Sequence, residues 1–507
     1  MSKAKTTSRR RWIRYGILVA AIIVAAVLLL GPVWIAPIHG PTQMPYHELK
    51  DHAQYGADYV AKEVPQFALA VFVLCMALWM TNLIPLASTG LLAVSLLPLL
   101  GIVEPKQAFA YFGNSAVFFI MGVFLLAAAM IRTGLSKRLT LILLQRFDRR
   151  PGLLIVGVTC SAAFLSLWMP AYAVAAMMFP IVLEVTDSLD LRKGKSGYAR
   201  TLFFGLAWGA MIGSCGSFLG GARAPLAVEL LRDTYRLPDG GTEYAIGFLD
   251  WMTIAMPLVV IMTVAAVLIL LRFFPSEVTD ITPATRMLNQ RVKLLGRMSV
   301  RERRLAALAI ITIVCWIGLS QFIDGGVAVI AILSAVMLSA LRIAGWQETQ
   351  EYVNWGVVVM YGGAVALGAA LKDTHAMLAV VQQVVPSADT PPMLLLFLMA
   401  ALSLVLSCAI SNAAAVAVLL PVGYALCDVT QPAVNPVAMT YAIAISSGLA
   451  FVLPISSPPL AICHASGHFG MKEVPKYGIP LTALALAVMM GWMWLYWPIV
   501  GLEITQP

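Results

Sequence analysis

A short polar sequence inside an apolar stretch has the clearest capacity for chemistry in this chain. Ser411-Asn412 interrupts the apolar run from Ala401 to Val422. Ser and Asn side chains bond to their own backbone and so favour a turn over a continuous helix. A helix that breaks within lipid has to line a cavity or be buried in protein, because unpaired backbone groups are costly there. We therefore predict a re-entrant hairpin over residues 390–427, with Ser411, Asn412 and Ala413 at a ligand-binding tip.

Two more apolar helices, predicted over residues 201–231 and 438–461, are interrupted near their centres. Between residues 213 and 225 the first contains four glycines and a proline, a composition that does not sustain a helix. Glycine also allows bare backbone to approach a ligand closely. Prolines and serines interrupt the second helix over residues 454–459. We expect Gly221 and Ser457 to line the same site as the hairpin tip.

Arg223 stands within the glycine-rich interruption. A charge at membrane depth costs several kcal/mol unless it is paired, so such a residue indicates function. The guanidinium group is a planar fork that can bind a carboxylate or sulfate through two hydrogen bonds. We predict that Arg223 binds an anionic substrate. The alternatives are a structural ion pair with Glu229 and a side chain that reaches the membrane interface.

The hairpin has a weaker counterpart earlier in the chain. Residues 165–181 align without gaps on residues 406–422, and residues 117–132 align on residues 357–372 at nearly the same offset. Internal repeats with broken helices at corresponding positions indicate the central site of a transporter. We predict a first hairpin over residues 151–186, with Tyr172 at its tip.

The composition is that of a membrane protein. Of 507 residues, 60% are hydrophobic and 12% are charged, and several apolar windows exceed the roughly 20 residues that span a bilayer. The net charge of +9 comes from basic residues clustered in a few loops. This clustering favours a positive-inside topology over nucleic-acid binding. We predict a multi-pass protein of the cytoplasmic membrane of a prokaryote, with a cytoplasmic N-terminus.

The predicted fold is all-α, with about eleven membrane crossings and two re-entrant hairpins. Residues 1–66 contain the cytoplasmic N-terminus, a first helix and an outer loop. Residues 67–274 and 305–507 form two repeats of inverted topology. Residues 275–304 form a basic cytoplasmic linker between the repeats, and a short amphipathic helix over residues 132–150 is expected on the same surface.

These motifs resemble those of the divalent anion:sodium symporters, within the ion transporter superfamily. Ser411-Asn412-Ala413 stands at the place of the family's Ser-Asn-Thr motif, and residues 451–459 look like its proline-rich break. Residues 164–168 and 175–181 resemble the flanks of the family's first motif. The resemblance implies a homodimer in the lipid membrane, in which a transport domain moves like an elevator against a scaffold. It also implies small di- or tricarboxylates or sulfate as substrates, carried with sodium.

The chain departs from the family pattern at the expected ion sites. Pro170-Ala171-Tyr172 replaces the first Ser-Asn-Thr motif, which leaves Ser166 and Gly213 in a degenerate first sodium site. The second site keeps more of its ligands, at Ser407, Asn412, Ser456 and Pro458, and oxygen ligands suit a hard cation. We therefore expect a transporter of small divalent anions with reduced sodium coupling and with no cofactor other than sodium.

Two other functions stay open at this point. A sodium-independent anion exchanger of the same fold would also fit reduced cation sites. A channel or a membrane enzyme is the remaining alternative, but the sequence contains no HExxH, GxSxG or Walker motif.

Overall fold

The computed structural model describes residues 15–28, 64–81, 83–237, 242–273, 277–319, 326–377, 380, 390–453 and 457–506. Within these ranges the regular elements are helices, accompanied by two isolated bridges between single residues. Eight of the described helices are long and apolar enough to cross a membrane, and five shorter ones are also apolar. The expectation of an all-α polytopic membrane protein is therefore confirmed.

The described helices coincide with the predicted crossings. The first falls at Tyr15–Leu28, and the rest of the predicted residues 1–66, except for the start of the next helix, lies outside the described residues. The helices of the first half are α3 (Val64–Thr81), α4 (Leu86–Leu99), α5 (Pro105–Phe112), α6 (Ser115–Thr133), α7 (Leu135–Gln145), α8 (Pro151–Leu165), α9 (Ala171–Ser188), α10 (Gly197–Gly213), α11 (Arg223–Thr234) and α12 (Phe248–Phe273). Those that follow are α13 (Thr282–Leu294), α14 (Val300–Gly318), α15 (Gly326–Ala340), α16 (Trp346–Gln350), α17 (Trp355–Asp373), α19 (Pro392–Ala409), α20 (Asn412–Val429), α21 (Pro436–Ser447), α22 (Pro458–His464) and α23 (Glu473–Leu495).

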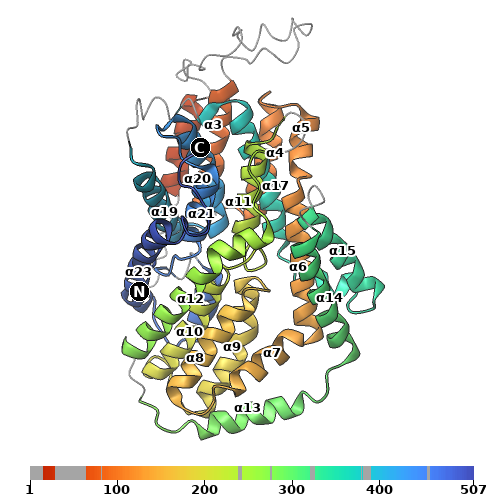
Figure 1. Cartoon of the computed structure of the whole chain (residues 1–507), viewed down its shortest axis with the longest axis vertical. Coiled ribbons are helices and arrows are strands. Elements are labelled where there is room, and N and C mark those ends of the chain that lie inside the picture. The colour runs from red at the N-terminus through yellow and green to blue at the C-terminus, as the bar shows by residue number, and fades with distance from the viewer. Residues whose placement is uncertain are drawn as a thin grey trace, which may run out of the picture.

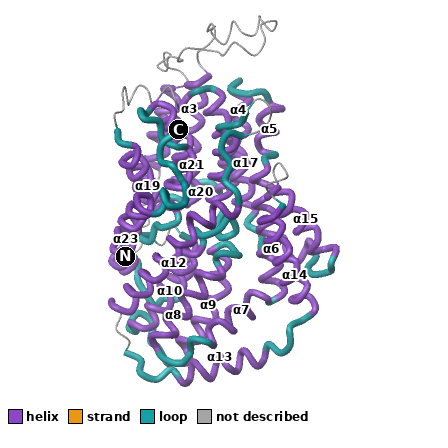
Figure 2. Tube along the Cα trace, in the orientation of Figure 1, coloured by secondary structure: helices purple, strands orange, loops and turns teal. Residues whose placement is uncertain are grey.

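Two helical hairpins, α8–α9 and α19–α20, lie toward opposite ends of the long axis of the molecule (Figure 1). Proline stands in the first turn of α8 and of α19, where its missing N–H costs nothing. In the middle of the molecule, loop segments separate the helices of the upper and lower halves (Figure 2). This arrangement is the one that two inverted repeats predict. The division of the chain into repeats at residues 275–304 stays a prediction.

Small residues bring the first hairpin and the first broken helix into backbone contact. A Cβ atom at Gly205, Gly209 or Gly213 of α10 would lie 2.0–2.5 Å from atoms of Thr159 or Ala163 in α8. Small residues at four-residue spacing allow this close approach of helices in membranes. The corresponding pair in the second half, α19 and α21, is joined by side-chain hydroxyl groups instead. Each hairpin therefore packs closely against its broken helix.

The predicted basic linker contains a helix, α13, which runs along the lower end of the molecule below α7 and α9 (Figure 1). The helix predicted over residues 132–150 is present as the shorter α7, and its place on the cytoplasmic surface stays a prediction. Membrane helix α6 extends to Thr133, and Gly134 with φ of 84° separates it from α7. Arg138 of α7 is buried and binds Glu302 through two bonds of 2.9 and 3.2 Å. This pair attaches α7 to the start of α14, whereas the adjacent Lys137 is exposed.

Candidate functional site

The break between α10 and α11 is held by the tip of the first hairpin. Ser217 Oγ donates a hydrogen bond of 2.5 Å to the Leu167 carbonyl, and the Ala171 N–H donates one of 3.1 Å to the Gly220 carbonyl. A Cβ atom at Gly220 would lie 2.4 Å from the Ser166 carbonyl oxygen, so only glycine fits at this position. The two polar segments of the first half therefore form one unit.

Arg223 is the first residue of α11 and is only 4% exposed. Its Nη2 atom donates to Ser214 Oγ at 3.1 Å and to Cys215 Sγ at 3.0 Å, whereas its Nε atom has no hydrogen-bond partner in the described ranges. No carboxylate among the described residues forms an ion pair with it. A buried cation without a counter-charge is strongly unfavourable. The positive end of the α11 dipole lies at the same place, so the position is suited to an anion.

The alternative role of Arg223, an ion pair with Glu229, does not occur in this structure. The Glu229 carboxylate instead accepts a hydrogen bond of 2.5 Å from Ser115 Oγ, at the start of α6. Arg223 and Glu229 lie more than one turn apart on α11, and their side chains have different partners. The interfacial alternative is also wrong, because the guanidinium group is enclosed by protein.

The predicted bidentate arrangement, in which the Arg223 guanidinium group donates two hydrogen bonds to one anion, is not preformed. A guanidinium group offers two edges to a carboxylate, and each of them includes Nη2, which Ser214 and Cys215 already occupy. The donors left are Nε and Nη1, which point to different sides of the group. Arg223 is therefore held in place by the α10–α11 break and presents single donors to a ligand.

Two glycines leave room for the guanidinium group. A Cβ atom at Gly448, just after α21, would lie 2.5 Å from Cζ and Nη2 of Arg223 and 2.7 Å from Nε. A Cβ atom at Gly221 would lie 3.0 Å from Nη1. Gly448 belongs to the second half of the chain and Arg223 to the first. The two halves thus meet directly at the charged group.

Hydroxyl groups of α19 build the second half of the site. Ser403 Oγ and Ser407 Oγ, one turn apart, donate to the carbonyl groups of Ile443 and Ser447 at 2.7 and 2.6 Å. Ser407 Oγ also lies 2.8 Å from Asn412 Oδ1. Since Ser447 directly precedes Gly448, these contacts join the second hairpin tip to the slot that holds Arg223.

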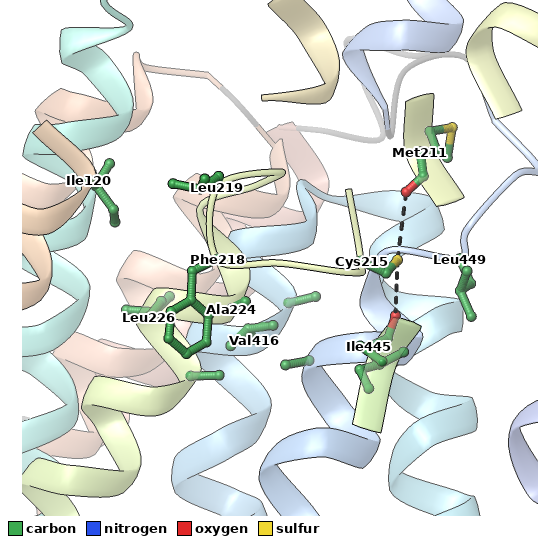
Figure 3. Packing of buried hydrophobic residues seen from close by; sticks show 14 of the residues in the cluster. Ile120, Met211, Cys215, Phe218, Leu219, Ala224, Leu226, Val416, Ile445 and Leu449 are labelled. Carbon is green, nitrogen blue, oxygen red and sulfur yellow. Dashed lines mark hydrogen bonds between the residues drawn. The ribbon is translucent and has the colours of Figure 1, made fainter. Parts of the chain in front are cut away.

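The first and second halves also cross at Cys215. Its Sγ atom lies 3.6 Å from the Met211 carbonyl and 3.9 Å from the Ile445 carbonyl of α21 (Figure 3). Both breaks are therefore packed together in the interior. They do not face lipid separately.

The predicted sodium ligands are arranged unequally in the two halves. Asn412 and Ser407 contact each other, as described above, and Ser411 caps α20 by accepting from the Ala414 N–H at 3.3 Å. Ser166, the counterpart of Ser407, is fully buried, and its hydroxyl has no partner among the residues that the structure describes. The reason is that Ala171 stands in the position equivalent to Asn412 and offers no side-chain oxygen. The first site therefore lacks the pair that the second retains.

Other predicted site residues lie apart from Arg223 in their contacts. The Tyr172 ring packs edge-on against Phe124 of α6, with ring centroids 6.2 Å apart. Ser457 is buried in front of α22, Pro458 is exposed, and Ala413 is partly buried in the first turn of α20. Ser456 lies outside the described residues. The structure thus groups Arg223, Gly221, Ser407 and Asn412 around Gly448.

Sequence reasoning missed Ser214, Ser447 and Gly448. Ser214 acts through its hydroxyl group at the end of α10, and Ser447 acts through its carbonyl group at the end of α21. A single serine among apolar residues does not indicate a binding site. Gly448 could have been found, because it stands at the end of α21, and the corresponding helix of the first half, α10, also ends in a glycine, Gly213. Its role depends on Arg223, and only the fold brings these two residues together.

An all-helical fold with apolar spans, and a buried polar centre formed by two broken helices and two hairpins, defines a multi-pass membrane transporter. The family model described as the sodium:sulfate symporter transmembrane region matches residues 60–502. This chain belongs to that family, and it is a transporter of anions, not an enzyme.

The similar proteins agree with this assignment. The chain is 25% identical over 467 residues to the sodium-dependent dicarboxylate transporter SdcS of Staphylococcus saprophyticus, covering 87% of this chain and 88% of the relative. It has the same identity and coverage to the protein of that name from Staphylococcus aureus strain USA300. Among solved structures, the fold is similar to that of Neisseria gonorrhoeae MtrF, which is described as illuminating a class of antimetabolite efflux pumps. The TM-score is 0.56 and the sequence identity is 12%. That match covers 98% of this chain and 97% of MtrF, and it shows similarity of fold alone.

Proposed function

We propose that this protein is a secondary transporter of small divalent anions, either di- or tricarboxylates or sulfate, with Arg223 supplying fixed positive charge in the anion site. The observation that carries the proposal is the buried guanidinium group, which has no carboxylate partner and no partner for Nε within the described part of the chain. The names of the family and of its dicarboxylate-transporting relatives support this substrate class.

Sodium coupling is proposed to be reduced to one site. Ser407 and Asn412 provide oxygen atoms of the kind that a hard cation prefers, together with the Ser447 carbonyl at the same place. The first site retains the Ser166 hydroxyl but has no amide beside it. Sodium-independent anion exchange is the second candidate function, and the fixed charge of Arg223 favours it. The Arg223 guanidinium group cannot leave the site as a bound sodium ion can. Moving the site through the membrane without an anion therefore costs free energy.

The remaining parts of the proposal follow the family. The hairpins and broken helices would form a transport domain that moves against the other helices like an elevator, in a homodimer surrounded by lipid. The protein would lie in the cytoplasmic membrane of a prokaryote with its N-terminus inside, because the basic linker around α13 fits the cytoplasmic side.

Uptake into proteoliposomes tests the function. Succinate and sulfate uptake that saturates, and that is accelerated by the same anion on the far side, would support a carrier, whereas flux linear in concentration would indicate a pore. Arg223→Lys keeps the charge and Arg223→Gln removes it. We expect the Gln variant to lose most of its affinity and the Lys variant to retain part of it. Normal affinity in both variants would contradict the role of Arg223.

A further inference from the structure

Tyr361 of α17 is a buried tyrosine whose hydroxyl group has no partner. The residue is 0% exposed, and no hydrogen bond to its hydroxyl oxygen exists among the described residues. A buried polar atom without a partner carries a free-energy penalty, so such an atom in a functional region needs an explanation. Arg223 Nε is a second unpaired and buried polar atom. The positions of these two groups are related.

Contacts between α11 and α17 fix their relative direction. A Cβ atom at Gly368 would lie 2.7 Å from the Leu230 side chain, and one turn further along both helices Lys372 Nζ donates to the Asp233 carbonyl at 2.7 Å. The contacts advance in the same sense on the two helices, so α11 and α17 run parallel here.

The same register places Tyr361 opposite Arg223. Tyr361 precedes Gly368, and Arg223 precedes Leu230, by seven residues, which is about two helical turns and returns to the same helix face. The neighbours Gly362 and Gly363 face other helices, at Phe112 and Gly90. Tyr361 therefore lies on the face of α17 that contacts α11 through Gly368 and Lys372.

We infer that Tyr361 is a further substrate-binding residue, whose hydroxyl group donates a hydrogen bond to the anion held at Arg223. The inference rests on the proposed anion site. It explains two unpaired buried groups by one ligand, because a carboxylate or sulfate oxygen can accept both from Arg223 Nε and from a phenolic O–H. Tyr361 would also contribute an anion-binding group from α17, a helix that belongs neither to the hairpins nor to the broken helices.

The test compares Tyr361→Phe with Tyr424→Phe. Both tyrosines are buried, but the Tyr424 hydroxyl lies 2.8 Å from Thr440 Oγ1 and donates to the Ala227 carbonyl at 3.4 Å. Unfolding temperatures in detergent are measured without anion and with succinate or sulfate. A purely structural hydroxyl group stabilises the anion-free protein, whereas a group reserved for a ligand does not.

For Tyr361→Phe we expect an anion-free unfolding temperature equal to or above that of the wild type. The anion concentration needed for half the thermal shift should rise about 10- to 100-fold, the range for one hydrogen bond to a charged group. Tyr424→Phe should show the opposite pattern, with a lower unfolding temperature and unchanged anion affinity. In the double variant Arg223→Lys with Tyr361→Phe, the losses of affinity should be less than additive because both groups bind one anion.

Wild-type affinity in Tyr361→Phe, with loss of affinity in Arg223→Gln, would overturn this inference and leave the proposed function intact. A lower anion-free unfolding temperature with an unchanged anion response would also overturn it. If the wild-type protein responds to neither anion and Arg223→Gln transports normally, the proposed anion site itself is wrong.

Discussion

Gly448→Ala is the most direct test of how the two halves of the chain share the charged site. The new methyl group would lie 2.5 Å from Cζ and Nη2 of Arg223, far inside van der Waals contact. The guanidinium group is the end of a flexible side chain and can move away, but it then gives up its bonds to Ser214 and Cys215. Hydrogen bonds to a charged group are worth about 1.5–3 kcal/mol each, and overpacking a core costs about 1–3 kcal/mol.

Ligand binding should be weakened as well as folding. A displaced Arg223 no longer offers its charge-assisted hydrogen bond, which is worth about 1.5–3 kcal/mol, so the apparent dissociation constant for succinate should rise roughly 10- to 100-fold. Thermal-shift titration in detergent and initial uptake rates in proteoliposomes measure the two quantities.

Gly423→Ala is the matched control. Its methyl group would lie 2.9 Å from the Met439 side chain and 3.0 Å from that of Ile443, so it crowds flexible apolar groups without touching Arg223. We expect a similar loss of stability with unchanged anion affinity. In an Arg223→Ala background the Gly448→Ala change should cost little, because the clash is gone. Wild-type affinity in Gly448→Ala would refute the reasoning.

Three further changes test other parts of the structure. Asn412→Ala removes the amide oxygen beside the buried serine hydroxyl of α19; we expect the difference between uptake in sodium and uptake in choline to disappear, and a persistent difference would contradict the second site. Arg138→Ala leaves Glu302 buried without its cation and should destabilise the protein by about 3–5 kcal/mol. Arg291→Ala breaks an ion pair that is about 40% exposed and should cost at most about 1 kcal/mol. Equal shifts in unfolding temperature would disprove this ranking. Ala171→Asn offers a partner to the unpaired hydroxyl after α8 and should raise both the unfolding temperature and the sodium dependence of uptake; a lower unfolding temperature would count against it.

Most of the helical elements were accessible from the sequence because lipid imposes simple rules. A chain that crosses a bilayer has to satisfy its backbone within helices, so long apolar runs predict spans and polar residues within them predict breaks. The interruptions at Ser411-Asn412 and around Gly220 are both present as loops between helices. The same reasoning placed Arg223 within a break, but it left open a side chain that reaches the interface, which the burial of Arg223 excludes.

The tertiary structure alone decided which groups face the charge. Periodicity shows which residues share a helix face, but it does not specify which helix lies opposite, so the sequence did not indicate that Gly448 lies against Arg223. The partners of Arg138 and Glu229 were equally hidden, since Glu302 and Ser115 lie more than a hundred residues away in the chain. Local sequence fixes where a membrane helix starts and breaks, because those events depend on neighbouring residues and the bilayer. The surroundings of a buried charge depend on contacts between distant segments, and these form only when the helices pack.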